Sequence, residues 1–344
     1  MCNLIFGKIL PTLKVPDRDA SGKLAIITGA NTGIGFYIAL DLVKRNATVY
    51  LACRSEARAQ EAISNILSKV PTARGRLHSL VLDTSSLTSV RAFATTWHKL
   101  DKHVDLLIHN AGTAQAPAGE DFTSEGFEAV YTTNFLSSFL VTYLLETALS
   151  ADARVIFTSS AGSYAARFSK GFSISAVKER IEPGFHAAAL SENAITLGRV
   201  PKDSSRYGNS KAMQIAFAKT LQAKWDRRAK EGGTKVTRVA HAFSPGFVYT
   251  PVFEKMGKCS MLQDLPFWFL NVSLNVLAGN AAAGAKTAVW LAITRDEAVI
   301  GKGNGGSYWE RMTRRTSSVD LLSDEVLRRM WIRWEADAGI QWRD

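Results

Sequence analysis

The feature that most constrains the fold is a short apolar run followed by three glycines and a helical stretch near the N-terminus. Residues 24–27 are typical of a buried parallel strand, and residues 34–43 have helical periodicity. Between them lie Gly29, Gly33 and Gly35. Glycines let the backbone approach a phosphate, and the free N–H groups of a first helical turn point at it. An ordinary turn is the alternative, but the strand and helix around it favour a dinucleotide site.

The alternation of apolar and amphipathic segments continues along the chain. Further strands are expected at 47–52, 76–82, 104–109, 154–158 and 235–242. Further helices are expected at about 55–69, 86–100, 124–149, 207–229 and 323–334. We find no linker, charge block or repeat. The pattern predicts one α/β domain with a doubly wound parallel sheet, the Rossmann fold.

Composition narrows the classes of function. The 344 residues are 46% hydrophobic and 21% charged, which is typical of a soluble globular chain. The net charge of +11 comes from scattered basic residues, so no nucleic-acid partner is expected. Three distant cysteines (Cys2, Cys53 and Cys259) indicate a reducing, cytoplasmic setting. The six histidines lack metal-binding spacing, so no metal site is expected.

The glycine spacing, Thr-Gly-x-x-x-Gly-Ile-Gly, resembles the classical branch of the short-chain dehydrogenase/reductase family. The resemblance continues through Asn-Ala-Gly at 110–112 and Tyr-x-x-x-Lys at 207–211 to about residue 292. Within the family the chain is most similar to the retinol-dehydrogenase-like branch. Its C-terminal part also resembles fungal reductases of secondary metabolism.

The catalytic residues implied by the resemblance are Ser160, Tyr207, Lys211 and Asn134. Tyr207 and Lys211 are four residues apart and share one helix face, and a lysine cation lowers a tyrosine pKa that is normally about 10. Ser160 follows the fifth strand, at the sheet edge where ligands bind, and would stabilise a developing oxyanion. Ser159 is its alternative. Asn134 matches the asparagine that anchors a water relay to the lysine; the alternative is a polar residue at a helix kink.

The end of the second strand indicates the cofactor. An enzyme that prefers NAD usually carries an acid there, whereas this strand ends in Cys53 and Arg54. Arg54 can pair with a 2′-phosphate, which favours NADP(H), although a surface charge is the alternative. The residues expected to bind NADP(H) are Gly29, Asn31, Thr32, Gly33, Ile34, Gly35, Arg54, Asp83, Thr84, Asn110, Ala111, Gly112, Tyr207, Lys211, Pro245, Gly246, Val248 and Thr250.

The sequence therefore predicts an NADPH-dependent oxidoreductase, a carbonyl reductase or alcohol dehydrogenase, acting on a bulky apolar ketone, aldehyde or alcohol. Secondary metabolites, retinoids, steroids and lipid-like molecules remain open as substrates. A non-catalytic NADPH-binding sensor or scaffold is the alternative. We expect a core at about 21–310, an insertion at 161–206 that selects the substrate, and a C-terminal extension at 311–344.

Two stretches leave peripheral contact with an intracellular membrane or lipid droplet open. One is the apolar segment 261–270, for which a substrate-pocket wall is favoured. The other is the Trp/Arg-rich tail, for which a helix packed through Leu327, Trp331 and Trp334 is favoured. A homodimer is also left open.

Overall fold

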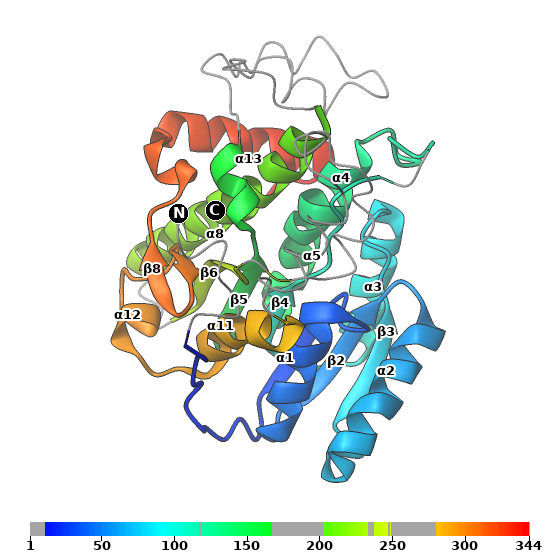
Figure 1. Cartoon of the computed structure of the whole chain (residues 1–344). Coiled ribbons are helices and arrows are strands. Elements are labelled where there is room, and N and C mark those ends of the chain that lie inside the picture. The colour runs from blue at the N-terminus through cyan, green and yellow to red at the C-terminus, as the bar shows by residue number, and fades with distance from the viewer. Residues whose placement is uncertain are drawn as a thin grey trace, which may run out of the picture.

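Eight strands form a single sheet in the order β3-β2-β1-β4-β5-β6-β7-β8 (Figure 1). The computed structural model describes residues 11–116, 119–166, 202–232, 237–246, 248 and 280–343. The strands are β1 (Leu24–Thr28), β2 (Thr48–Cys53), β3 (Leu77–Val81), β4 (Val104–His109), β5 (Leu149–Thr158), β6 (Val239–Ser244), β7 (Tyr308–Glu310) and β8 (Thr313–Arg315). Neighbours pair in parallel except β7 and β8, which are antiparallel. The predicted doubly wound sheet is confirmed, with two strands that were not predicted, the parallel β7 and the antiparallel edge strand β8.

Helices cover both faces of the sheet. The α-helices are α1 (Gly33–Lys44), α2 (Glu56–Lys69), α3 (Leu87–Lys99), α4 (Ala129–Tyr131), α5 (Ser137–Leu145), α8 (Lys202–Gly232), α11 (Ala281–Ile293), α12 (Glu297–Ile300) and α13 (Asp324–Ala338). The shorter turns are η2 (Pro71–Ala73), η3 (Thr132–Leu136), η4 (Glu146–Ala148), η5 (Ala161–Ala165) and η7 (Ser318–Leu321).

The side chains of β1 show how the two faces are filled. Ala25 and Ile27 belong to the core cluster under α1, α2 and α11, and Leu24 and Ile26 belong to the cluster under α3, α5 and α8. Successive side chains of a strand point to opposite faces, so a strand buried on both faces is apolar throughout. This is why the first strand reads as a continuous apolar run.

The helix expected at 124–149 is wrong in its limits and in its continuity. It begins at Ala129, because the side chain of Glu128 accepts hydrogen bonds from the N–H groups of Val130 and Tyr131. It is interrupted by the π-helical turn η3 and ends before β5, which begins at Leu149. The π-turn is relevant to the site because it contains Asn134.

The C-terminal helix α13 packs against α5 and α8 through a cluster of aromatic side chains. Trp334 is 1% exposed, and its ring centroid lies 4.6 Å from that of Phe135. Trp342, four residues beyond the end of α13, is 4% exposed and lies 5.3 Å from the Phe139 ring. The packed-helix interpretation of the tail is confirmed. These indole rings are core residues and offer no free surface for a membrane.

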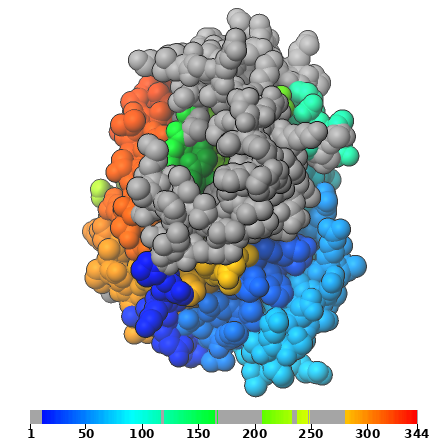
Figure 2. Space-filling model, in the orientation of Figure 1, coloured from blue at the N-terminus to red at the C-terminus, as the bar shows by residue number. Residues whose placement is uncertain are grey.

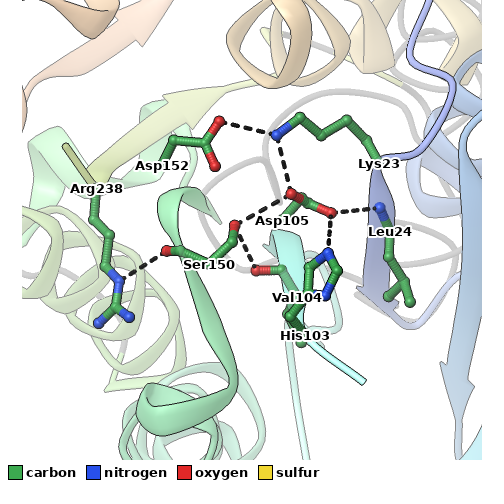
Figure 3. Close-up of polar contacts among 8 residues, drawn as sticks. All are labelled: Lys23, Leu24, His103, Val104, Asp105, Ser150, Asp152 and Arg238. Carbon is green, nitrogen blue, oxygen red and sulfur yellow. Dashed lines mark hydrogen bonds and ion pairs between the residues drawn. The ribbon is translucent and has the colours of Figure 1, made fainter. Parts of the chain in front are cut away.

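A polar network joins the amino ends of three central strands (Figure 3). The buried Asp105, on β4, accepts hydrogen bonds from the Leu24 N–H at 2.8 Å and from Lys23 Nζ at 3.0 Å. The Ser150 hydroxyl, on β5, donates to Asp105 at 3.2 Å. Lys23 Nζ also donates to Asp152 at 2.9 Å. The network fixes β1, β4 and β5 to one another at the edge opposite the site.

The first described residues run along the surface beside the C-terminal half of the chain, as the dark blue atoms in Figure 2 show. Lys286 Nζ, on α11, and Arg311 Nη2 each donate at 2.6 Å, to the carbonyls of Leu13 and Pro11. Within the described ranges no helix is long and apolar enough to cross a membrane.

Candidate active site

Tyr207 and Lys211 come from α8, which crosses the carboxyl end of β5. Lys211 Nζ lies 5.6 Å from the centroid of the Tyr207 ring, and donates a 2.9 Å hydrogen bond to the carbonyl of Thr158. Lys211 is buried, and burial lowers its pKa to about 8. The side chains share one helix face as predicted, with the ammonium held beside the phenol.

Ser160 lies directly after β5 and begins the short turn η5. Its hydroxyl accepts a 3.1 Å hydrogen bond from the Gly162 N–H. A Cβ on Gly162 would lie only 3.3 Å from Tyr207 Cε1 and 3.6 Å from Ser160 Oγ. Because Gly162 has no side chain, Tyr207 and Ser160 can approach each other closely. Burial raises the pKa of Tyr207, and hydrogen bonding to Ser160 acts in the opposite direction.

The neighbouring serine is used differently. Ser159 is buried, and its hydroxyl donates to the main-chain carbonyl of Lys211 at 2.7 Å. It therefore ties β5 to α8, and its proton is not available to a ligand. The geometry favours Ser160 over Ser159 as the residue that faces a substrate.

Asn134 lies in the π-turn η3 and is fully buried. Its Nδ2 donates to the Thr113 carbonyl at 2.8 Å and to Ser210 Oγ at 2.9 Å, and its Oδ1 accepts from the Thr113 N–H at 2.7 Å. The side chain thus joins the loop after β4 to α8. The helix irregularity expected as the alternative is present, and the role of Asn134 in a relay stays a prediction.

The glycine turn joins β1 to α1 beneath the loop that follows β4. Gly29 has φ +65°, and a Cβ there would lie 2.9 Å from Ala111 Cα. Thr28 Oγ1 accepts 2.9 Å hydrogen bonds from the N–H groups of both Asn110 and Ala111. The N-cap residue of α1, Thr32, makes no side-chain cap hydrogen bond, so N–H groups of the first turn are left for an anion. This opening fits a pyrophosphate.

The end of β2 carries the residues expected to contact the adenosine ribose and its 2′-phosphate. Arg54 is exposed, and no described carboxylate pairs with it. Cys53 is buried, and burial raises its thiol pKa to about 11, so the group is neutral where an NAD-binding enzyme would have a charged acid. Asp83, after β3, accepts hydrogen bonds through Oδ1 from the N–H and hydroxyl of Ser85. Thr84 is half-buried beside it.

The Pro-Gly loop after β6 packs against α11 next to the glycine turn. A Cβ on Gly284 would lie 2.8 Å from Val248 Cγ2, 3.2 Å from Pro245 Cβ and 3.4 Å from Ile34 Cγ1. Gly246 has φ +78°. The Pro-Gly loop therefore lies close to the start of α1. One cofactor molecule could contact both the loop and the first turn of α1. The predicted residue Thr250, the apolar segment 261–270 and residues 167–201 of the insertion expected at 161–206 lie outside the described residues. Residues 202–206 of that expected insertion belong to α8, which begins before the expected residue 207.

His109, the last residue of β4, is a packed strand histidine. Its ring stacks on Phe157 at 5.0 Å, and Nε2 lies 2.9 Å from Thr142 Oγ1. Burial lowers its pKa to about 3, so the ring is neutral. In the part of the chain that the structure describes, no group of three or more His, Cys, Asp or Glu could hold a metal ion.

Sequence reasoning missed two polar residues on α8. Ser210 and Gln214 are both buried and both bond to Asn134. Their spacing of four was a usable signal, because it puts two polar groups on one helix face. Their partner could not be identified from the sequence.

The comparisons with known proteins agree with this geometry. Residues 23–180 match the family model described as short chain dehydrogenase. A short-chain dehydrogenase/reductase, pkfC, of Emericella nidulans is 28% identical over 97% of this chain and 98% of its own length. Retinol dehydrogenase 12 of Mus musculus is 30% identical over 93% of this chain and 88% of its own.

Solved structures show the same fold. The oxidoreductase yciK of E. coli has a TM-score of 0.59 at 17% identity, over 88% of this chain and 99% of its own. The actinorhodin polyketide ketoreductase with NADPH has a TM-score of 0.57 at 18% identity, over 86% and 97%. The chain belongs to the short-chain dehydrogenase/reductase family. Its class is thus that of oxidoreductases acting on CH–OH and carbonyl groups with a nicotinamide cofactor.

Proposed function

We propose that this protein is an NADP(H)-dependent oxidoreductase that interconverts a ketone or aldehyde and an alcohol on a bulky apolar substrate. The observation that carries the proposal is the convergence of Ser160, Tyr207 and Lys211 at the carboxyl end of β5. Ligands of open α/β sheets bind at this edge.

The three side chains divide the proton chemistry. When the cofactor is bound, its reduced nicotinamide supplies the hydride. The Ser160 hydroxyl donates a hydrogen bond to the substrate carbonyl oxygen and stabilises its developing negative charge. The Tyr207 hydroxyl donates its proton to that oxygen, and the Lys211 ammonium stabilises the phenolate that remains. In the oxidative direction the Tyr207 phenolate takes the proton back.

The residues fit the cofactor at three places. The uncapped first turn of α1 would bind the pyrophosphate, with Gly29, Gly33 and Gly35 as the turn. Arg54 would pair with the 2′-phosphate, and Asp83 would hold the adenine. The actinorhodin polyketide ketoreductase, a solved structure of the same fold, contains NADPH, which supports NADP(H) as the cofactor.

The substrate class is inferred from the relatives. Several are named retinol dehydrogenases, and a short-chain dehydrogenase/reductase of Colletotrichum higginsianum, dpchH, is 31% identical over 81% of this chain and 65% of its own length. A bulky apolar alcohol or carbonyl is consistent with the retinol dehydrogenases. Homodimer formation and peripheral contact with an intracellular membrane or lipid droplet stay predictions.

The test measures NADPH oxidation with ketones and aldehydes of increasing size, including retinal, and NADP⁺ reduction with the matching alcohols. Tyr207→Phe removes the proton donor and keeps the ring, so turnover should fall at least about a hundredfold while NADPH affinity survives. Ser159→Ala is the matched hydroxyl control and should change turnover far less. Tight NADPH binding with no turnover of any carbonyl would instead support a sensor or scaffold.

A further inference from the structure

Gln214 lies on α8, one turn beyond Lys211, and is 1% exposed. Its Nε2 donates to the main-chain carbonyl of Asn134 and, at 3.2 Å, to the Ser138 hydroxyl. Its Oε1 has no hydrogen-bond partner among the described residues. Burying a half-satisfied amide costs free energy, and an apolar side chain would be the ordinary choice for a core position. The donor contacts of Gln214 therefore call for an explanation.

The acceptor of the first Gln214 contact, the Asn134 carbonyl, lies in the π-turn η3. The carbonyl of Thr132 accepts from the N–H of Ser137, five residues later, in place of the usual four. The carbonyls of the next two residues receive side-chain donors. Ser137 Oγ donates to Thr133 at 3.1 Å, and Gln214 donates to Asn134. The wider turn is thus stabilised by side chains, and one of them comes from α8.

Gln214 and Ser210 together hold Asn134 at two points. The two residues are four apart, so they lie on one face of α8, and Ser210 accepts the Asn134 side chain while Gln214 binds its carbonyl. Tyr207 and Lys211 have the same spacing on the adjoining face. A slide or rotation of α8 against η3 would break both contacts to Asn134 and would displace the catalytic pair.

Lys211 and Asn134 meet at the loop after β4, which contains Gly112. A Cβ on Gly112 would lie 3.1 Å from Lys211 Nζ and 3.2 Å from Asn134 Oδ1, so the ammonium and the amide converge on the same glycine. The side chain of Lys211 therefore packs at the same place as the side chain of Asn134, which belongs to the π-turn.

We propose that Gln214 is a positioning residue, which fixes the π-turn against α8 and thereby holds Lys211 at its distance from Tyr207. The proposal rests on the proposed function, since it concerns the same proton donor. Among the described residues, the other charged groups packed near this region are Arg206, paired with Asp121 at 3.2 Å, and Glu128, whose carboxyl caps α4. On α13, Asp337 pairs with Arg333 at 2.8 Å and accepts a hydrogen bond from the Tyr131 hydroxyl. They are unchanged in the variants below.

The test is Gln214→Leu, which keeps the approximate size and removes the donors. Alcohol oxidation requires the Tyr207 phenolate, so a displaced Lys211 should move the acidic limb of kcat/KM, where activity rises as Tyr207 loses its proton, upward by at least about 0.5 pH units. At pH 7 kcat should fall at least about threefold, with KM for NADP⁺ close to that of the wild type. Gln214→Glu, which places an acceptor oxygen against the carbonyl, should lower kcat at least as much.

Gln222→Leu is the matched control. Gln222 is a buried glutamine two turns further along α8, and it bonds to Asp226 and to the main chain of Arg238 and Ala240, away from η3. The Gln222→Leu substitution should lower the melting temperature and should not shift the limb of the kcat/KM pH profile. If Gln214→Leu gives the same result, with lower stability and an unmoved limb, the positioning role is overturned.

A second readout separates this proposal from the proposed function. If the wild type turns over no carbonyl or alcohol, the proposed function fails. The Lys211 titration is then followed by NMR of ε-¹³C-lysine-labelled protein, with Lys211→Met to assign the signal. A changed titration midpoint in Gln214→Leu supports the positioning role, and an unchanged one overturns it.

Discussion

Lys211 is the residue at which stability and chemistry conflict most directly. Its ammonium is buried, with one described hydrogen bond, to the Thr158 carbonyl. Burial lowers its pKa to about 8, so at pH 7 the folded protein holds a charge that the unfolded chain would place in water. Such a charge is retained where a site uses it.

The first prediction concerns this charge. Lys211→Met should abolish turnover and raise the free energy of unfolding at pH 7 by up to about 3 kcal/mol, because a shift from 10.5 to about 8 corresponds to that cost. Below pH 8 the lysine is charged in both states and the cost is complete. Between pH 8 and 10.5 only the unfolded state is protonated, so wild-type stability rises with pH and the difference shrinks. Urea unfolding at several pH values measures it.

Lys219→Met is the control for that experiment. Lys219 also lies on α8, but its side chain is 36% exposed, near Asp320. Its replacement should change the unfolding free energy by less than about 0.5 kcal/mol at every pH. If both variants behave alike, the buried charge of Lys211 is not the cause.

A second residue-scale prediction concerns Arg54. Its exposed guanidinium has no described carboxylate partner and follows the neutral Cys53. NADPH should bind at least about tenfold more tightly than NADH, or about 1.4 kcal/mol. Arg54→Ala should reduce that affinity ratio, because it weakens the binding of NADPH and not that of NADH. Arg58→Ala, in the first turn of α2, should reduce the ratio less. Equal wild-type affinities, measured by fluorescence titration, would contradict the assignment of NADP(H).

At the scale of secondary-structure elements, the carboxyl ends of the strands carry the candidate site, and the amino ends carry a polar network that joins the strands. The carboxyl ends of β1, β4, β5 and β6 are followed by the glycine turn, the Asn-Ala-Gly loop, Ser160 and the Pro-Gly loop. The amino ends of β1, β4 and β5 are joined by the Asp105 network (Figure 3). The contact between Ser150 and Asp105 holds the amino end of β5 against β4, next to the register shift that follows Val104.

The element-scale prediction concerns Asp105. Asp105→Ala should lower the free energy of unfolding by about 2–4 kcal/mol, because it leaves the Leu24 N–H without its partner and removes a buried acceptor. Asp152→Ala is the control, since Asp152 is 60% exposed and bonds to the half-exposed Lys23. It should cost less than about 1 kcal/mol. Similar losses in chemical denaturation would show that the buried contact to β1 contributes little.

At the scale of the whole molecule, the C-terminal helix completes the core behind the catalytic turn. The Tyr131 hydroxyl, next to the π-turn, donates to Asp337 at 2.9 Å, across 206 residues of sequence. Phe135, within the turn, packs on Trp334. The π-turn is therefore held by α8 on one side and by α13 on another.

The corresponding prediction is that Trp334→Ala lowers the free energy of unfolding by about 3–5 kcal/mol and reduces turnover of the remaining folded protein, because the cavity lies against Phe135. Trp331→Ala, at a half-buried position on the same helix, should cost less. Calorimetry and turnover at 20 °C check both. A loss of stability without any loss of turnover would mean that α13 supports the fold but not the site.

Much of the fold and site follows from local sequence patterns. The apolar run before Gly29 predicted β1, because a strand buried on both faces needs apolar side chains at every position. The spacing of Tyr207 and Lys211 predicted one helix face, because that relation holds within a single turn of helix. The fourth strand was predicted with its observed limits.

The tertiary structure alone decided the rest, because the deciding contacts are long-range. The π-turn at Asn134 is stabilised by Gln214, 80 residues away, and no pattern within the helix itself reveals that partner. The tail could have been read as a membrane-binding or a core helix, since tryptophans suit both. Their burial against Phe135 and Phe139 decided it. The sequence by itself determined the family, the parallel sheet from β1 to β6 and the candidate catalytic residues, whereas the packing of distant segments determined how those residues are held.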